Sequence, residues 1–521
     1  MSARFLMFFV ILLSWPFDSE SQVLEPVRTE IPARIDAPGY YKLLLGERGM
    51  IHFYESTDFT DDGKRKWFFS LYDTGFREQW TQSLGLMDGY GLAGSVVTSK
   101  YAFMLFSTNN SRKSNQRGYE LLRFDAGSGT FQLMGSLLPE KAEIQGFTAL
   151  LNLAFIGVNL PDYKSDLLMI NMDQLITTSL SHRISGQNII QAVQADEKRG
   201  KFIVGFKRFT SNRFEEEVFQ IYNNEGIQQQ TFTYKLDPNY LHSYLLNFDT
   251  VGNLIVAGSY DNNAGGRNTA KDAANQDAMT FDSKGLFFLR FTEQGIETQR
   301  FYPFESFGNI YRALPTDELM RARQRQARSK EGARQPADVS FQFYKPRLVQ
   351  HPDFMVFAAE AFKPQYRLET RMDYDFYGRM VPYTYSIFEG YNYFSALIVA
   401  FDQQGNLIWS NDVELRDILL PYLQNVVTVQ LDGSDVVASY VMEGVITSKV
   451  VGPDGKEKGQ TEQVKIESTF ANDRLLEENF TDVTYWYDKY FLVSGYQKIS
   501  NNKLRTDNPR TVYFLQKLVF E

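Results

Sequence analysis

The sequence contains no cysteine and only four histidines among its 521 residues. Without cysteine the chain cannot form a disulfide framework, a thiolate metal site, a cysteine nucleophile or a lipidated cysteine anchor. The histidines, His52, His182, His242 and His351, have no metal-ligand spacing. The sequence also lacks a glycine-rich phosphate loop and a nucleophile elbow. We therefore expect no metal, no cofactor and no recognisable catalytic constellation.

The chain also lacks an excess of positive charge and an apolar run long enough to cross a membrane. The net charge of −9 is spread along the chain, which argues against a nucleic-acid partner, because such binding needs a basic face. The apolar run from Phe5 to Trp15 follows Arg4 and precedes the small residues Ser19 and Ser21. It has the length of a secretory signal, roughly 7–15 residues, and falls short of the about 20 that a membrane span needs. We predict a signal peptide over 1–21 and a secreted or periplasmic protein without a membrane span; the alternative is a buried N-terminal strand.

Aromatic residues are abundant, and they accompany a recurring pattern. The chain has 43 Phe and 30 Tyr, which fit the pleated, half-buried surface of a strand. The pattern is an apolar strand, an Asp or Asn with a Gly, and a second strand, as expected of hairpins whose turns need a side-chain acceptor and a positive φ. The turn residues of the clearest copies are Asp73 and Gly75, Asp125 and Gly129, Asn223 and Gly226, Glu293 and Gly295, Asp402 and Gly405, and Asp454 and Gly455.

A further apolar strand precedes each two-stranded hairpin, and turn signals before that strand indicate one more. Each unit therefore contains four strands. These second strands begin near residues 50, 103, 153, 202, 254, 355, 436 and 491. The early spacing of about 50 residues matches one propeller blade. Many of the strands are apolar at consecutive positions, as expected where both faces are covered. We predict an all-β fold, a β-propeller of about eight four-stranded blades over residues 22–521, with seven blades as the alternative. The last unit lacks one strand, which residues 27–31 could supply, closing the ring.

Three long intervals interrupt the repeat, at 261–284, 305–340 and 361–394. Loops tolerate such insertions at little cost. The second interval contains a basic segment that Thr316 can cap, so we predict a helix near 316–331. Its arginines suit an anionic glycan, a lipid headgroup or an acidic partner, and the alternative is a solvated excursion.

The hairpin turns also carry a family resemblance. Asp73 and Gly75 are followed by Trp80, and Asp402 and Gly405 by Trp409. With these residues the chain resembles the quinoprotein-like (PQQ-like) and related repeat propellers, whose blades place an Asp, a Gly and a Trp around the same turn. The chain also has a general similarity to secreted propellers of Gram-negative bacteria. The resemblance implies the fold, but no activity, cofactor or active site.

The third interval is the strongest candidate for a binding site. Flat rings lie beside carboxylates and guanidinium groups there, a combination that suits sugars, because rings stack on C–H faces and charged groups hold hydroxyls. The candidate residues are Glu360, Arg371, Asp373, Tyr374, Asp375, Tyr377, Tyr383, Tyr385 and Glu389. The alternative is a long hairpin whose rings pack on the blade beneath. Glu360 interrupts an apolar run, so we expect a raised pKa or a pairing with an arginine such as Arg367.

Two functions remain open at this point. The first is a non-catalytic binding or scaffolding propeller, monomeric, with a glycan or a protein as its partner. The second is a carbohydrate-active enzyme, a glycoside hydrolase or lyase, that uses carboxylates and tyrosines of the 360–394 interval. The enzyme would need two carboxylates about 5–10 Å apart in one cleft. We favour the binding module, because the sequence offers no catalytic constellation.

Overall fold

The computed structural model describes residues 27–33, 39–108, 117–235, 240–261, 282–307, 320, 340–503 and 508–519. Within these ranges the chain consists of β-strands with three short 3-10 helices: η1 (Gly46–Arg48), η2 (Pro161–Tyr163) and η3 (Phe304–Ser306). The expected signal peptide over 1–21 lies outside the described residues. So does the helix expected near 316–331, apart from Met320. No helix of the described part is long and apolar enough to cross a membrane.

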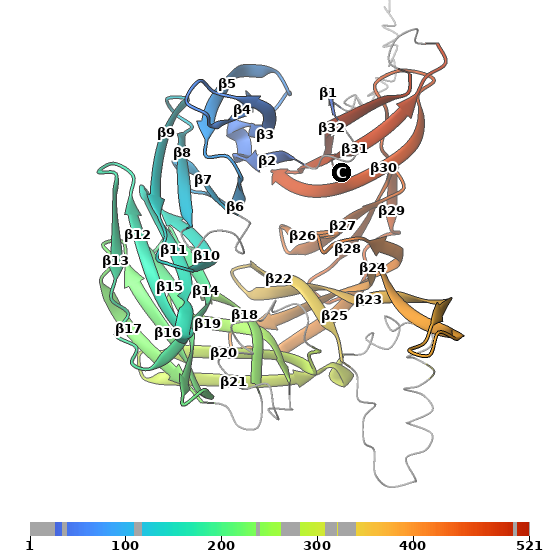
Figure 1. Ribbon diagram of the computed structural model, residues 1–521. Coiled ribbons are helices and arrows are strands. Elements are labelled where there is room, and N and C mark those ends of the chain that lie inside the picture. The colour runs from blue at the N-terminus through green and yellow to red at the C-terminus, as the bar shows by residue number, and fades with distance from the viewer. Residues whose placement is uncertain are drawn as a thin grey trace, which may run out of the picture.

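The strands form eight antiparallel four-stranded sheets, which we call blades 1 to 8 in chain order (Figure 1). Blades 1 to 4 comprise β2 (Tyr40–Leu44), β3 (Met50–Phe59), β4 (Arg65–Tyr72) and β5 (Glu78–Leu86); β6 (Tyr90–Val97), β7 (Tyr101–Thr108), β8 (Gly118–Asp125) and β9 (Thr130–Leu137); β10 (Glu143–Leu150), β11 (Leu153–Leu160), β12 (Lys164–Asn171) and β13 (Ile176–Leu180); and β14 (Gln187–Asp196), β15 (Lys201–Thr210), β16 (Arg213–Asn223) and β17 (Gln228–Tyr234).

Blades 5 to 8 follow the same order, except that the last blade takes one strand from the N-terminal end. They comprise β18 (Tyr240–Phe248), β19 (Leu254–Asp261), β20 (Gly285–Thr292) and β21 (Gly295–Pro303); β22 (Gln342–Gln350), β23 (Phe354–Tyr374), β24 (Met380–Asp402) and β25 (Leu407–Leu420); β26 (Val427–Asp432), β27 (Asp435–Met442), β28 (Val445–Val451) and β29 (Glu462–Lys465); and β30 (Arg474–Tyr487), β31 (Tyr490–Ser500), β32 (Arg510–Val519) and β1 (Arg28–Pro32).

This architecture is an eight-bladed β-propeller, as the repeat predicted. The second strands of the blades, β3, β7, β11, β15, β19, β23, β27 and β31, begin within two residues of the expected positions. The match is close because these strands have the most apolar sequences of each blade and begin just after a turn.

The hydrophobic core is divided into clusters between neighbouring blades. Eight clusters of described residues join blade 1 to blade 2, blade 2 to blade 3 and so on round the ring, and the eighth joins blade 8 back to blade 1. Strand β7 shows how one strand serves two of them, since Phe103 and Leu105 face blade 3 whereas Met104 and Phe106 face blade 1. Burial on both faces explains why these strands are apolar at consecutive positions.

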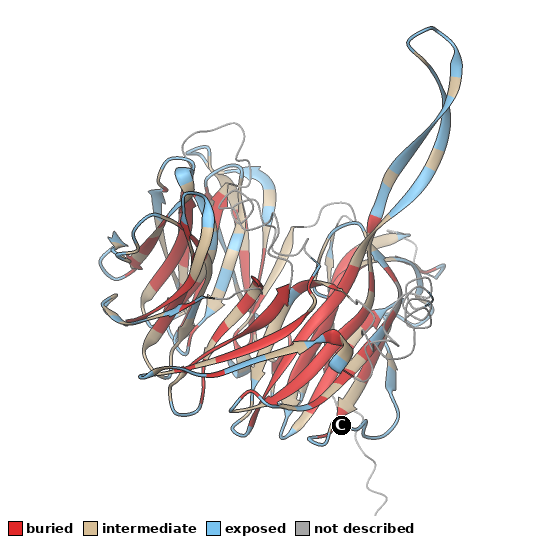
Figure 2. Cartoon of the chain, turned by 90° about the horizontal axis from the view of Figure 1, so that it is seen from below, coloured by how far each residue is buried: buried red, intermediate tan, exposed pale blue. Residues whose placement is uncertain are grey.

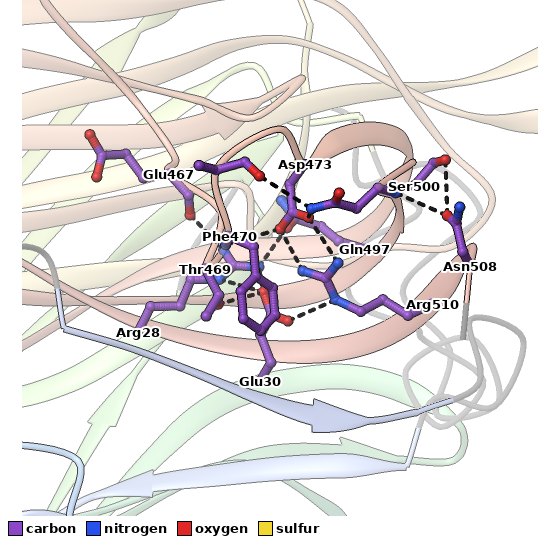
Figure 3. A network of polar contacts seen from close by, with 12 residues as sticks. Arg28, Glu30, Glu467, Thr469, Phe470, Asp473, Gln497, Ser500, Asn508 and Arg510 are labelled. Carbon is purple, nitrogen blue, oxygen red and sulfur yellow. Dashed lines mark hydrogen bonds and ion pairs between the residues drawn. The ribbon is translucent and has the colours of Figure 1, made fainter. Parts of the chain in front are cut away.

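The ring closes through the N-terminal strand, which confirms the strand-counting prediction for residues 27–31. β1 pairs antiparallel with β32, from Arg28 opposite Gln516 to Pro32 opposite Val512. Figure 3 shows the polar network around this joint, in which Glu30 lies between Arg28 and Arg510. A strand contributed from the opposite end of the chain thus covers the edge of β32, which would otherwise be open to uncontrolled pairing, and completes the four strands of blade 8.

The interval 361–394 is the one predicted insertion whose course the structure follows throughout. It consists of the extended ends of β23 and β24, which run far beyond the blade as a twisted two-stranded hairpin (Figure 2). Residues 262–281 and 308–339, which make up most of the other two insertions, lie outside the described residues, apart from Met320.

Candidate functional site

The candidate site is the projecting hairpin of blade 6. Beyond Tyr391, which pairs with Leu420, β24 has no further pairing with β25. In the described part of the chain, residues 366–389 therefore pair with each other and with no third strand. We call residues 366–389 the arm. The hypothesis that its rings pack on the blade beneath is wrong, since Figure 2 shows the arm standing clear of the ring with most of its length exposed.

The tip of the arm uses the turn chemistry of the blade hairpins. Asp375 Oδ1 accepts hydrogen bonds from the backbone N–H groups of Tyr377 and Arg379, both at 2.9 Å. Gly378 has a φ of +75°, a conformation that costs glycine little. Asp402 makes the same pair of backbone contacts, to Gln404 and Asn406, between β24 and β25. Asp375 is thus used to form the turn, and the ring of Phe376 beside it is 97% exposed.

The two faces of the arm differ sharply in charge. From Tyr366 opposite Phe388 to Tyr374 opposite Met380 the register is regular, so alternate residues and their cross-strand partners share one face. That face, which we call the uncharged face, consists of Tyr366, Leu368, Thr370, Met372, Tyr374, Met380, Pro382, Thr384, Ser386 and Phe388. Leu368 is 75% exposed and Tyr374 68%. No residue of this face carries a formal charge at neutral pH.

The opposite face holds the arm's ionic groups, and they interact with one another. Arg371 Nε lies 2.6 Å from Glu369 Oε1, and this hydrogen bond lowers the pKa of Glu369 and raises that of Arg371. The hydroxyl of Tyr385 donates to Asp373 Oδ2 at 3.0 Å, and this bond is the largest cause of the raised pKa of Tyr385. Tyr383 lies on the same face, opposite Arg371 in the strand register. The ionic face therefore satisfies its own charges, while the uncharged face is left exposed to solvent.

Glu360 lies apart from the arm, in the buried part of β23. Its carboxylate accepts hydrogen bonds from the backbone N–H groups of Val426 at 2.9 Å and Val427 at 3.0 Å, at the start of blade 7. Burial raises its pKa to about 7, although these two bonds and the charge of Arg347 oppose the rise. The expected pairing with Arg367 is wrong: Arg347 lies 3.9 Å from Glu360, and Arg367 lies near Glu369 and Glu389.

The structure separates Glu360 and Glu389 from the carboxylates at the tip of the arm. Glu360 and Asp373 are thirteen residues apart on the single strand β23, which corresponds to about 40 Å in an extended chain. Glu389 lies at the bulge near the base of the arm, where Gln365 pairs with Gly390 and Tyr366 with Phe388. Among the described residues no group of three or more His, Asp or Glu side chains could hold a metal ion.

The sequence pattern points to the aromatic and charged residues of the arm but not to the apolar residues that distinguish its two faces. Leu368, Met372 and Met380 were not among the candidates, yet each is more than half exposed on the uncharged face. Alternation of charged and uncharged residues from 366 to 374 is the signal that could have revealed them. This alternation does not by itself assign the residues of β24 to the two faces, because that assignment requires the cross-strand register.

Comparison with known proteins finds distant structural likenesses and no closer relationship. No family model and no curated protein matches the chain. Solved structures similar to it include the β-propeller domain of the Trilobed protease from Pyrococcus furiosus, at 9% identity over 83% of this chain and 99% of that chain with a TM-score of 0.35. Sqt1 from Saccharomyces cerevisiae is 10% identical over 91% of this chain and 97% of that chain, with a TM-score of 0.38.

A third similar structure is prolyl oligopeptidase B from Galerina marginata. The identity is 8%, the TM-score is 0.40, and the match covers 90% of this chain but 55% of that one. Likenesses this distant carry no functional argument. The class of the protein follows from its own eight sheets, which form an eight-bladed β-propeller.

Proposed function

We propose that the protein is a non-catalytic binding propeller, acting outside the cytoplasm, whose arm docks a partner protein through the uncharged face. The observation that carries the proposal is an exposed strand pair with one face that lacks formal charge, beginning at Tyr366 and Phe388 and ending at Tyr374 and Met380. Exposed apolar surface that is concentrated on one feature typically marks an interaction site. The location outside the cytoplasm follows from the predicted signal peptide alone.

The composition of the uncharged face favours a protein over a lipid surface or a glycan. A lipid surface attracts basic segments, but the arm contains three arginines against four acidic residues. Leu368 and Met372 offer neither a flat ring for stacking on a sugar nor a strong hydrogen bond. Methionine and aromatic side chains are instead enriched in the buried centres of protein interfaces. The expected partner therefore presents an apolar surface without charged groups.

The shape of the arm also supports docking. A two-stranded hairpin without a third strand is marginally stable in water, and in the described structure the arm pairs with no strand of the ring beyond its own base. A partner that covers the uncharged face would supply the missing apolar contacts. Large exposed side chains such as Tyr374 and Leu368 would then enter pockets of the partner.

The enzyme hypothesis receives less support. A glycoside hydrolase needs two carboxylates about 5–10 Å apart beside its substrate. Glu360 holds the start of blade 7, Asp375 forms the turn at the tip, and Asp373 accepts the hydroxyl of Tyr385. The narrower resemblance to quinoprotein-like propellers stays a prediction and adds no cofactor to this proposal.

Photo-crosslinking at adjacent positions of β23 tests the proposal. Leu368 is replaced by a photoreactive phenylalanine derivative, and in a matched variant Glu369 is replaced by the same residue. Neighbouring positions on a strand point to opposite faces, so the two variants sample the uncharged and the ionic face at the same distance from the ring. After irradiation of the cells that produce the protein, we expect one protein adduct of defined mass at position 368 and none at position 369.

Two results would count against docking through this face. One is the absence of any adduct at position 368 when the protein is folded and the photoreactive residue is incorporated. The other is a set of adducts that is the same at both positions, which would indicate random contact with an exposed hairpin. The adduct at position 368, once identified by mass spectrometry, supplies the partner for measurements of affinity.

A further inference from the structure

A second candidate site lies where blades 7, 8 and 1 meet, apart from the arm. A pocket of about 350 Å³ opens there between the start of β2, the residues that precede β26, and strands β30 to β32. Its lining includes Tyr40, Lys42, Asn425, Phe480 and Asp482. A concave site with aromatic walls and a few converging polar groups is the usual form of a small-molecule site.

The charges of the pocket neutralise each other. Lys42 Nζ lies 2.5 Å from Asp482 Oδ1 and 2.6 Å from Ser494 Oγ, and the Ser494 hydroxyl donates to the same carboxylate oxygen at 2.8 Å. The Asp482 side chain keeps 38% of its surface exposed, whereas Lys42 keeps 13%. The pocket thus presents a carboxylate held in place by a mostly buried ammonium group. A ligand with a strong charge of either sign would have to compete with this pair.

An aromatic wall stands beside the carboxylate. The ring of Phe480 is stacked on Tyr422, with centroids 5.1 Å apart and planes 13° apart, and it meets the ring of Tyr496 edge-on at 5.7 Å. Phe480 has a φ of +55° and lies in the β-bulge between Asn479 and Asp482. A bulky residue in the left-handed region is uncommon, and bulges re-aim side chains next to functional sites. The backbone of β30 is thus distorted at the residues that bring Phe480 and Asp482 to the pocket.

The loop that precedes β26 is held in place by strand β24, near the base of the arm. The buried Tyr393 hydroxyl donates to the carbonyl of Gln424 at 2.7 Å and accepts from its N–H at 3.0 Å. This double contact fixes the loop that contributes Gln424 and Asn425 to the lining. Their side-chain amides are neutral groups that can both donate and accept hydrogen bonds.

We propose that this pocket binds a neutral sugar residue. A sugar ring presents C–H groups that stack on aromatic rings and hydroxyl groups that donate to a carboxylate and exchange hydrogen bonds with amides. The aromatic wall, the exposed carboxylate of Asp482 and the amide of Asn425 supply these three contacts in a pocket without net charge. The volume is in the range of small-molecule sites, roughly 300–1,000 Å³. This site is independent of partner docking by the arm.

Saturation-transfer NMR with free sugars tests the assignment. The probes are the methyl glycosides of glucose, galactose, mannose and N-acetylglucosamine, each at millimolar concentration with the full-length mature protein. We expect transfer to the ring protons of at least one glycoside. Because a hydrogen bond to a charged group is lost, Asp482→Asn should weaken its binding about tenfold. Asp353→Asn, which alters an exposed carboxylate in the turn between β22 and β23, should leave the binding unchanged.

Asn425→Ala gives a second variant that keeps the Lys42–Asp482 pair, in case Asp482→Asn fails to fold. It should weaken binding of the same glycoside severalfold while the thermal unfolding midpoint stays unchanged. Absence of transfer from all four glycosides would overturn the proposal. So would binding that is as strong in Asn425→Ala as in the wild-type protein. Both outcomes leave the crosslinking test of the arm unaffected, because no partner protein is present.

Discussion

Replacing Arg510 by alanine is expected to lower the free energy of unfolding by about 3 kcal/mol, the low end of what breaking a buried ion pair costs. Arg510 contacts both oxygens of Asp473, at 2.9 and 2.5 Å, and lies 3.1 Å from Glu30 of β1 (Figure 3). The Asp473 side chain is fully buried, and that of Arg510 is 13% exposed. Removal of the guanidinium would leave a buried carboxylate without its cation, at the joint between the two ends of the chain.

The effect of Arg510→Ala should depend on pH. Burial alone would raise the pKa of Asp473, but the hydrogen bonds from Arg510 and Asn501 outweigh burial and lower this pKa below its usual value of 3.8. A carboxylate with a lowered folded-state pKa stabilises the fold above its unfolded-state pKa and loses that contribution as the pH falls. Urea unfolding should therefore show the full difference between wild type and variant at pH 7 and a smaller one as the pH falls below about 4.

Arg379→Ala is the matched control for Arg510→Ala, the variant that tests the closure of the ring. Arg379 lies 3.5 Å from Asp375 at the tip of the arm, where its side chain is 73% exposed. An exposed ion pair contributes about 0–1 kcal/mol, so this variant should unfold within about 0.5 kcal/mol of wild type. If Arg510→Ala and Arg379→Ala proved equally mild at neutral pH, the joint between β1 and blade 8 would not hold the ring closed in the way described.

The second large effect is expected at Lys207 and Glu217 in blade 4, where the side chains of both residues are fully buried. The Lys207 ammonium donates to the carbonyl of Leu241 at 2.7 Å and lies 3.9 Å from Glu217 Oε1, while Tyr244 donates to Glu217 Oε2 at 3.2 Å. Above pH 7, where Glu217 is ionised, Lys207→Met should destabilise the protein by about 3–5 kcal/mol, because the buried carboxylate loses its cation.

A double variant distinguishes the effect of the buried charges from the effect of side-chain packing. Lys207→Met combined with Glu217→Leu removes both charges and fills the space with apolar atoms, so it should be clearly more stable than Lys207→Met alone. Equal instability of the single and the double variant, measured by urea unfolding, would show that packing rather than charge accounts for the loss.

Glu217 should also make stability decrease with rising pH. Burial raises the pKa of Glu217 from 4.5 to about 7, against the opposing charge of Lys207. A carboxyl group with a raised folded-state pKa stabilises the fold below its unfolded-state pKa, and this contribution is lost as the pH rises through the folded-state value. Between about pH 5 and pH 8 the wild type should therefore lose stability relative to Glu217→Gln, with a total change on the order of 3 kcal/mol. A difference that stays constant over this range would contradict the assignment.

The sequence predicts the ring well because the ring depends on local patterns. Turns such as Asp402 to Gly405 form through contacts within a few residues, and consecutive apolar residues, as in Tyr101–Phe106, indicate burial on both faces. Together these two signals locate the second strand of each blade. The closing strand was predictable because the last unit contained one strand fewer than the others.

The candidate sites depend on contacts that the sequence pattern does not contain. The rings of the arm project away from the ring of blades because β25 stops pairing with β24 at Tyr391. No residue type in the sequence marks that point. The pocket brings Lys42 next to Asp482, 440 positions away along the chain. The contact between Lys42 of blade 1 and Asp482 of blade 8 can be predicted only when the closure of the ring is already known.

Removal of the arm tests the central claim that the propeller binds a partner protein through it. Gln365 and Gly390 face each other in the strand register, so residues 366–389 can be replaced by an Asn-Gly turn. The thermal unfolding midpoint should stay within about 2 °C of wild type, because the eight clusters between blades are unchanged. The dissociation constant for the partner crosslinked at position 368 should rise at least about 100-fold, the loss of two interface hot spots. A stable armless protein that binds this partner with unchanged affinity would contradict the account.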